Sequence, residues 1–284
     1  MRGCSRRVMV FIDAMLDSTG PTVLQRSHGL ARIMLGSRGL IDLAQAGSAK
    51  VMMPHVVGKC PEIVFLNTSG GMASGDRLEY HVGMQAGCRA VATTQTAERA
   101  YRANDCPARA QIRLTLGAGS WLDWLPQETI LFDGARLERM TRVDLGPGAG
   151  CMLLEMIVLG RQAMGERLSH LHLHDRREIW QGGRIIHHDA LSLSDAALPR
   201  LQDPAVLNGA KAMATLAVIA SHAPDLLGCA RAVLDEPGVT AAASAPPGRL
   251  ILRLLASDGW PLRRQINRLL GALRPDPLPR IWQV

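Results

Sequence analysis

Short strand-like segments separated by regular turn signals constrain the fold more than any other feature of this sequence. Apolar runs and runs of alternating apolar and polar residues recur along the chain, and alternation is the period of a half-buried strand. Clusters of glycine, proline and asparagine stand between these runs. The segments are 63–66, 78–84, 88–93, 110–116, 120–124, 129–132, 136–144, 151–158 and 168–174. This spacing predicts a mainly β fold built from many short antiparallel strands.

Two local patterns within this region predict more specific structures. Asp133-Gly134 lies between the runs 130–132 and 136–138, and Asp-Gly is a favoured two-residue hairpin turn. Thr96 followed by Glu98 is typical of the first turn of a helix. We therefore expect a hairpin at Gly134 and one or two helical turns over 96–103.

The pattern of the sequence changes after about Leu198. Asp203-Pro204 precedes an alanine-rich run, 205–220, which predicts a helix with proline at its first position. Further predictions are a helix within 224–234, an alternating strand over 249–255 and an amphipathic helix over 258–273. We expect a variable leader (1–24), a β-rich body (25–198) and an α+β C-terminal portion (199–284) packed on the body as a single structural unit.

A glycine-rich loop follows the strand-like run at 63–66 and is a candidate binding site. Gly70, Gly71 and Gly75 permit backbone angles that are closed to other residues. Asp76, if held by backbone N–H groups at the end of this loop, would stay ionised and serve as a ligand. The loop contains neither the lysine of a phosphate-binding loop nor the G-x-S-x-G order of a nucleophile elbow. A purely structural turn is the alternative interpretation.

Charge and cysteine usage indicate the compartment and the class of partner. The formal net charge is +7, which favours an acidic protein partner or a polyanion. An aromatic content of 4% argues against a stacking surface for single-stranded nucleic acid, so no nucleic-acid partner is expected. The six cysteines form no metal or disulfide spacing. With no run of about 20 apolar residues to span a bilayer, we expect a cytoplasmic protein without a membrane partner.

Some histidines and acids stand where they could bind a metal ion. His170, His172 and His174 would share one face of a strand, although the polar side of an amphipathic strand is the simpler interpretation. Glu155 interrupts an apolar run, 152–158, and a charged side chain there is costly unless it is paired or faces water. It would either pair with an arginine, with Arg161 as the candidate, or line an aqueous passage. Nothing pairs a nucleophile with a base, so we expect no catalytic residues.

Five sequence blocks occur in an order and spacing that resemble a known family. They are SGGMASGDRL, TTQTAERAYR, LDWLPQETILFDGARL, EMIVLGRQAMGE and LPRIWQV. Together they resemble the urease accessory protein D family (UreD, also called UreH) from about Gln25 to Gln283. One departure is that Ser74 stands where the family usually has glycine, which restricts the backbone of the loop.

The resemblance implies a non-enzymatic maturation chaperone for nickel-dependent urease. Its β-rich body would be wound helically or as a sandwich. It would bind apo-urease and the accessory protein F, which recruits the GTPase accessory protein G, and a homodimer is expected within that complex. Nickel would be a transient cargo rather than a permanently bound cofactor, and an internal tunnel has been proposed as its route.

Acidic side chains in or near the resembling blocks are the candidates for lining such a tunnel. Nickel must be attracted and then released, so weak oxygen ligands suit its transit better than a tight cage of histidine and cysteine. The candidates are Asp76, Glu98, Glu155, Glu166 and Asp189, with Arg161 fixing one acid and Gly70, Gly71 and Gly75 shaping the loop. A scaffold protein without ion conduction is the alternative, and a nucleic-acid binder is a more distant one.

Overall fold

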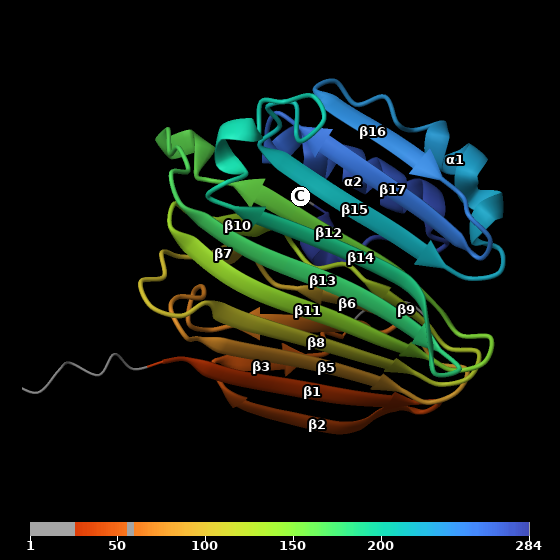
Figure 1. The fold of residues 1–284 in the computed structure, drawn as a ribbon. Coiled ribbons are helices and arrows are strands. Elements are labelled where there is room, and N and C mark those ends of the chain that lie inside the picture. Colours follow the sequence, from red (N-terminus) through yellow and green to blue (C-terminus); the bar gives the residue numbers. More distant parts are fainter. Residues whose placement is uncertain (1–25, 56–59, 284) are drawn as a thin grey trace, which may run out of the picture.

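The computed structural model describes residues 26–55 and 60–283, and its strands form two sheets packed face to face (Figure 1). The leader predicted for residues 1–24 lies outside the described residues. The inner faces of both sheets contribute to one large apolar core, which includes Ile33, Leu114 and Leu153.

The first sheet has the strand order β14-β13-β11-β8-β5-β1-β2. Its strands are β1 (His28–Gly36), β2 (Gly39–Gly47), β5 (Arg77–Met84), β8 (Ala108–Leu116), β11 (Ala135–Leu145), β13 (Leu171–Gln181) and β14 (Arg184–Ser194). The second sheet has the order β16-β17-β15-β12-β9-β6-β4-β3. Its strands are β3 (Ala49–Met52), β4 (Glu62–Asn67), β6 (Arg89–Thr94), β9 (Trp121–Trp124), β12 (Gly150–Leu159), β15 (Ala212–Ile219), β16 (Val239–Ser244) and β17 (Arg249–Ala256). The short strands β7 (Glu98–Ala100) and β10 (Thr129–Leu131) pair with each other, and β10 also joins β12.

From β4 to β13 the chain passes repeatedly from one sheet to the other and is wound helically. Strands that neighbour each other in a sheet are therefore separated in sequence by a strand of the opposite sheet, as β5, β8 and β11 are. This confirms the mainly β, helically wound fold. The mainly antiparallel pairing that the sequence predicts is wrong for the centre of both sheets, where β5–β8, β8–β11, β11–β13 and β9–β12 are parallel. A helical winding returns each strand in the same direction, so parallel neighbours follow from it.

Alternation of buried and exposed residues allows a strand of the first sheet to pack one face against the core. In β8, residues 108, 110, 112, 114 and 116 are buried while the residues between them are exposed. The strand β12 is instead buried on both faces. Its second face is covered from the C-terminal side, where α2 (Gly259–Leu273) packs Leu262, Ile266 and Leu269 into a second apolar cluster.

The C-terminal predictions are partly confirmed. The predicted amphipathic helix is α2, and the carboxylate of Asp258 caps it by accepting from the backbone N–H of Trp260 at 2.8 Å. The predicted strand over 249–255 is β17. Only α1 (Leu227–Arg231) and the preceding 3-10 turn η3 (Ala223–Leu226) form within 224–234. The other 3-10 turns are η1 (Gln162–Met164), η2 (Leu198–Arg200) and η4 (Arg280–Trp282).

Three local predictions are wrong. The alanine-rich run does not form a helix over 205–220, since turns lead from it into β15. The segment 96–103 contains β7 rather than helical turns. Asp133-Gly134 is not a hairpin turn, because the strands on its two sides, β10 and β11, belong to different sheets.

The C-terminal portion extends the second sheet. β15 pairs antiparallel with β12, and β17 pairs with β15. The division of the chain near residue 199 stays a prediction. Within the described residues, no helix is long and apolar enough to cross a membrane.

Candidate functional site

A network of ion pairs lies between the two sheets, where an apolar core would be expected. Arg139, on the inner face of β11, points towards the second sheet and places Nη1 2.8 Å from Oε2 of Glu155 on β12. Its guanidinium also donates to both carboxylate oxygens of Asp175, on β13, at 2.8 and 2.9 Å. All three side chains are buried, and Asp175 is 0% exposed. Such a bidentate pair is strong and directional.

The network continues from Asp175 to the surface. Arg177, also on β13, lies 3.6 Å from Asp175 and 3.3 Å from Asp189, measured between Nη2 and Oδ2. Asp189 on β14 also accepts from Nη2 of Arg253 on β17 at 2.8 Å. The side chain of Arg253 is 62% exposed. An unbroken chain of charged groups thus runs from the core to solvent.

Burial and pairing act in opposite directions on these acids. For Asp175, burial alone would raise the pKa, but the charge and the hydrogen bonds of Arg139 outweigh it and lower the pKa. For Glu155, burial is the larger influence and raises the pKa despite the attraction of Arg139. The carboxylates of Glu155, Asp175 and Asp189 face the guanidinium groups of Arg139, Arg177 and Arg253, so the charges are balanced.

Two hollows meet at Glu155. An internal cavity of about 50 Å³ is lined by Glu98, Arg139 and Glu155 among apolar and aromatic side chains. On the other side, a hollow of about 240 Å³ is lined by Glu155, Arg177 and Arg253. Glu155 borders both hollows, and Arg177, which lines the outer one, contacts Asp189 on β14. The acids Glu98, Glu155 and Asp189 are therefore connected in this order.

Glu98, which is half-buried, is the acid at the end of this line opposite to Asp189. Both of its carboxylate oxygens accept from Nδ2 of Asn67, at 3.1 and 3.3 Å. Burial raises its pKa to about 7, and the hydrogen bond from Asn67 only partly offsets this. Glu98 is therefore divided between its neutral and charged forms near neutral pH. A carboxyl group in this state exchanges a proton for a cation more readily than a firmly paired one.

Buried polar atoms without a partner mark the outer half of the network. Among the described residues, Nε of Arg177 and Oδ2 of Asp189 are buried and form no hydrogen bond. An unmatched acceptor in a buried position is costly unless water or an ion satisfies it. Oδ2 of Asp189 has only the ion-pair contact with Nη2 of Arg177 at 3.3 Å, so it is the position where such a group would add a hydrogen bond.

Asp76 lies outside the network and organises the glycine-rich loop. Its Oδ1 accepts from the backbone N–H of Ser27 at 2.7 Å, and its Oδ2 accepts from that of Ala73 at 2.8 Å. Gly70 and Gly75 adopt positive φ angles of 77° and 74°. Ser74 does not have a positive φ, so a serine is accommodated there without backbone strain.

Gly71 is the position in this loop where a side chain fits worst. A Cβ atom added there would lie 2.3 Å from Cε2 of Tyr101 and 2.7 Å from the backbone oxygen of Arg99. We expect Gly71→Ala to lower the free energy of unfolding by about 2 kcal/mol, since backbone cannot yield as a flexible side chain can. Urea denaturation measures this change.

Gly271→Ala is the matched control for this substitution. An added Cβ at Gly271, in α2, meets nothing within 4 Å. It should leave the protein as stable or stabilise it by up to about 1 kcal/mol, because alanine favours a helix. Equal stability of the two variants would contradict the close packing at Gly71.

Glu166 and Arg161 pair with each other, away from the network. Nη2 of Arg161 lies 3.0 Å from Oε1 of Glu166, and its backbone N–H donates to Oε2 at 2.8 Å. The guanidinium of Arg161 also stacks on the ring of Phe132 at 4.6 Å. The expectation that Arg161 pairs with Glu155 is therefore wrong, because Arg139 takes that position from the opposite sheet.

Four members of the network are not identified from the sequence alone, and they are Arg139, Asp175, Arg177 and the exposed Arg253. Arg139, Asp175 and Arg177 stand at inward positions of alternating strands, in line with buried apolar residues such as Leu173 and Ile179. Leu137, Thr141 and Val143 share the inner face with Arg139. A charged residue in register with buried apolar ones was the available signal.

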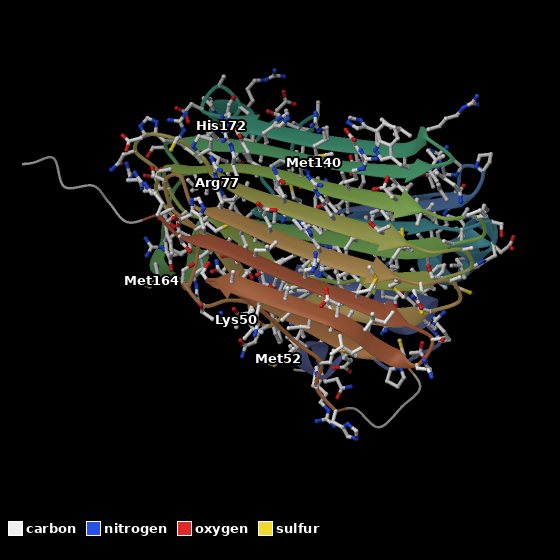
Figure 2. The ribbon with its side chains drawn as sticks, turned by 90° about the horizontal axis from the view of Figure 1, so that it is seen from below. Lys50, Met52, Arg77, Met140, Met164 and His172 are labelled. Carbon is white, nitrogen blue, oxygen red and sulfur yellow. The ribbon has the colours of Figure 1, made fainter. Side chains whose placement is uncertain are left out.

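The histidine row faces outward. His172 and Met140 lie on the outer face of the first sheet (Figure 2), and His170 and His174 are exposed. Across residues 26–55 and 60–283, no group of three or more histidine, cysteine, aspartate or glutamate side chains could hold a metal ion. A tight cage is therefore not what these residues form.

Comparison with known proteins gives one consistent result. The family model described as "UreD urease accessory protein" matches residues 28–283. A "Urease accessory protein UreD" of Paracoccus denitrificans (strain Pd 1222) is 67% identical over 95% of this chain and 97% of the relative. Proteins of the same name from Cereibacter sphaeroides (strain ATCC 17025 / ATH 2.4.3) and Jannaschia sp. (strain CCS1) are 57% and 47% identical, over 92% and 95% of this chain and 96% and 100% of theirs.

Proposed function

The chain belongs to the UreD urease accessory protein family, and on this premise we propose that it delivers nickel ions to apo-urease along the line of Glu98, Glu155 and Asp189. Members of this family are accessory proteins of urease maturation and not enzymes. The observation that supports the path is the chain of charged groups from the cavity at Glu98 to the surface at Arg253.

The chemistry of these groups suits transit rather than storage. Carboxylate oxygens and water bind a divalent cation more weakly than histidine and cysteine bind nickel. The arginines compete with the ion for each carboxylate, so an entering ion displaces an arginine and a departing ion is replaced by one. Compensated charges of this kind leave no deep trap along the path, as conduction requires.

We assign the path to Glu155 and Asp189, which belong to the network, and to Glu98, which lines the same cavity as Glu155. Asp76 and Glu166 have other contacts, and their part in the path stays a prediction. The proposed partners are apo-urease and the accessory proteins F and G, with a homodimer inside the assembly and the cytoplasm as the site of action. Nickel is the cargo and not a resident cofactor.

Glu155→Gln tests the path at its narrowest point. The substitution keeps the shape of the side chain and removes the charge that both hollows share. Urease co-expressed with this variant and the other accessory proteins should contain about tenfold less nickel and lose activity in proportion. Nickel content is measured on purified urease by elemental analysis.

The control for this variant is a glutamate on β11, the strand that carries Arg139, with its side chain on the outer face of the sheet. Glu138→Gln changes a half-buried glutamate on the outer side of β11, where it pairs with Arg109 at 2.9 Å. It should leave nickel loading unchanged. Normal loading with Glu155→Gln, while the complex still assembles, would contradict the path.

A scaffold role without ion conduction is the second candidate, and the charge balance of the network favours it. Three acids matched by three arginines could serve only to join the sheets. In that case the protein would orient its partners, and Glu155→Gln would leave both assembly and nickel loading intact. The same experiment therefore decides between the two.

A further inference from the structure

The second sheet extends beyond the first at one edge. The first sheet ends at β14, which pairs only with β13, whereas the second sheet continues through β15 and β17 to β16 (Figure 1). Arg249 and Arg253 reach from β17 to β14, which places β17 beside the free edge of β14. The strand β16 lies one strand further out.

The face of β17 and β16 turned towards β14 is partly open: Ile251 and Leu255 pack against the main core, whereas Arg253 and the residues of β16 on this face are exposed. On β17 this face carries Arg249, Ile251, Arg253 and Leu255, while the alternate leucines pack against α2. The register places Thr240, Ala242 and Ser244 of β16 on the same face, and all three are exposed. We call this face, with the edge of β14, the β14 shelf. Its outer residues are small, so they leave room for another chain.

The free edge of β14 is long, and its main interruption is the register shift at Ile186, whose backbone oxygen accepts from Arg249. β14 spans Arg184–Ser194 and contains neither lysine nor proline, which commonly block edge strands. Ile185, near its start, is 45% exposed. Unpaired backbone groups along such an edge are a template for an added strand.

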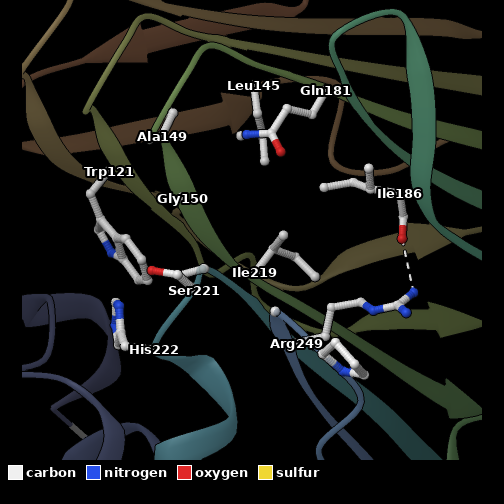
Figure 3. A pocket seen from close by; sticks show the side chains of 14 residues that line it. Trp121, Leu145, Ala149, Gly150, Gln181, Ile186, Ile219, Ser221, His222 and Arg249 are labelled. Atoms are coloured by element: carbon white, nitrogen blue, oxygen red, sulfur yellow. Dashed lines mark hydrogen bonds between the residues drawn. The ribbon is translucent and has the colours of Figure 1, made fainter.

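Hollows at both ends of the shelf offer space for side chains. At one end, a hollow of about 630 Å³ is walled by Trp121, His222, Ile186 and Arg249 (Figure 3). At the other end lies the hollow of about 240 Å³, which includes Leu191 and Leu255. From Ile186 to Leu191 a strand advances about 17 Å, so a short extended segment would reach both hollows.

The positive charges on the shelf favour binding of an acidic segment. Nη1 of Arg249 donates to the backbone oxygen of Ile186 at 2.8 Å, and no described acid lies within ion-pair distance of Arg249. Arg184 is exposed at the start of β14, and β16 has no charged residue. The one acid that faces the shelf, Asp189, is already held by Arg177 and Arg253.

We propose that the β14 shelf binds an extended acidic segment of a partner protein, which adds to β14 as a further strand. Its backbone would pair with the edge of β14, and an apolar side chain would occupy the hollow of about 630 Å³ beside Trp121 and Ile186. A carboxylate would pair with Arg249. This inference rests on the proposed function for the identity of the partner. The proteins used as probes are therefore apo-urease and the accessory F–G complex.

Amide hydrogen exchange of the full chain tests the added strand directly. Binding of one of the two partners should slow exchange of the β14 amides, 184–194, by about tenfold or more. Ala242→Glu and Arg249→Glu place negative charge on the β14 shelf. Each should lower the affinity for that partner by about tenfold or more. Binding to the other partner should stay unchanged.

The matched control introduces the same side chain at the opposite edge of the first sheet. Ala46→Glu, at an exposed position of β2, should leave both affinities as they are. Equal affinities for Ala242→Glu and the control, or β14 amides that exchange freely with both partners bound, would overturn the proposal. The proposal would also be overturned if the protein alone formed concentration-dependent dimers that Ala242→Glu dissociates, since a second copy would then occupy the shelf. These readouts are of binding, so they are separate from the nickel loading that tests the path.

Discussion

Replacing Arg139 by methionine is expected to lower the free energy of unfolding by about 3–5 kcal/mol, the largest effect of any substitution considered. The guanidinium is the common partner of Glu155 and Asp175, both at most 4% exposed. Without it, two carboxylates remain buried with no adequate countercharge, and each must take up a proton or admit water. Urea denaturation near neutral pH measures the loss.

Arg113→Met provides the control, because Arg113 is exposed on the outer face of β8 and lies next to β11. A surface change of this kind should alter stability by no more than about 0.5 kcal/mol. If the two variants were equally stable, the charges of the network would not be held in the way that the ion-pair distances indicate.

Neutralising the stranded acids should restore stability. Adding Glu155→Gln and Asp175→Asn to Arg139→Met removes both uncompensated charges while keeping the side-chain volumes. A large part of the lost stability should return, since the cost of a broken buried pair lies mainly in the charge that is left behind. Additive losses across the three substitutions would instead indicate that packing, and not charge, dominates at this position.

The parts of the fold that were predictable depend on neighbours in sequence. The helix α2 has its cap at Asp258 and a complete apolar face within one segment, so no tertiary information is needed. β8 likewise shows its buried face by alternation alone. By contrast, Asp133-Gly134 has a local turn signal that does not say which strands it joins. A turn between sheets and a turn between paired strands need the same residues.

Packing also overrode propensity in the C-terminal portion. The alanines of β15 favour a helix in isolation. In the fold, β15 lies between β12 and β17 and is buried on both faces, where small side chains let the covering layers approach. Sheet pairing with distant strands decides such a segment, and a single sequence does not reveal it.

The site shows the same limit. Glu155 was identified because a charge interrupts an apolar run, and the structure places it at the centre of the network. The sequence suggests Arg161 as its partner, but the partner is Arg139 of the facing sheet. The choice between Arg161 and Arg139 depends on which inner positions of β11 and β12 oppose each other, and this follows from the winding of the chain. A search for charged residues at the inward positions of alternating strands would include Arg139 among the possible partners of Glu155.

Glu98 is expected to make the stability of the protein fall as pH rises from about 4.5 to about 7. Its pKa moves from 4.5 to about 7 on folding, chiefly through burial. In this window the folded protein keeps a proton that the unfolded chain has released, so the unfolded state binds fewer protons and stability decreases with pH. Below the window both states are protonated. Above it, the accumulated loss approaches about 3 kcal/mol.

Glu98→Gln isolates this contribution, because glutamine can still accept the hydrogen bond from Asn67 but has no proton to lose. Other groups titrate in the same range: burial lowers the pKa of His81 and of His187, which makes stability rise with pH. The measurement is therefore the difference between wild type and variant, from urea denaturation at intervals between pH 4.5 and 8 with a chelator present. The wild type should lose up to about 3 kcal/mol relative to Glu98→Gln across this range. Parallel stability curves would mean that Glu98 is not held in the apolar cavity beside Arg139 and Glu155, and the inner end of the proposed path would have to be placed elsewhere.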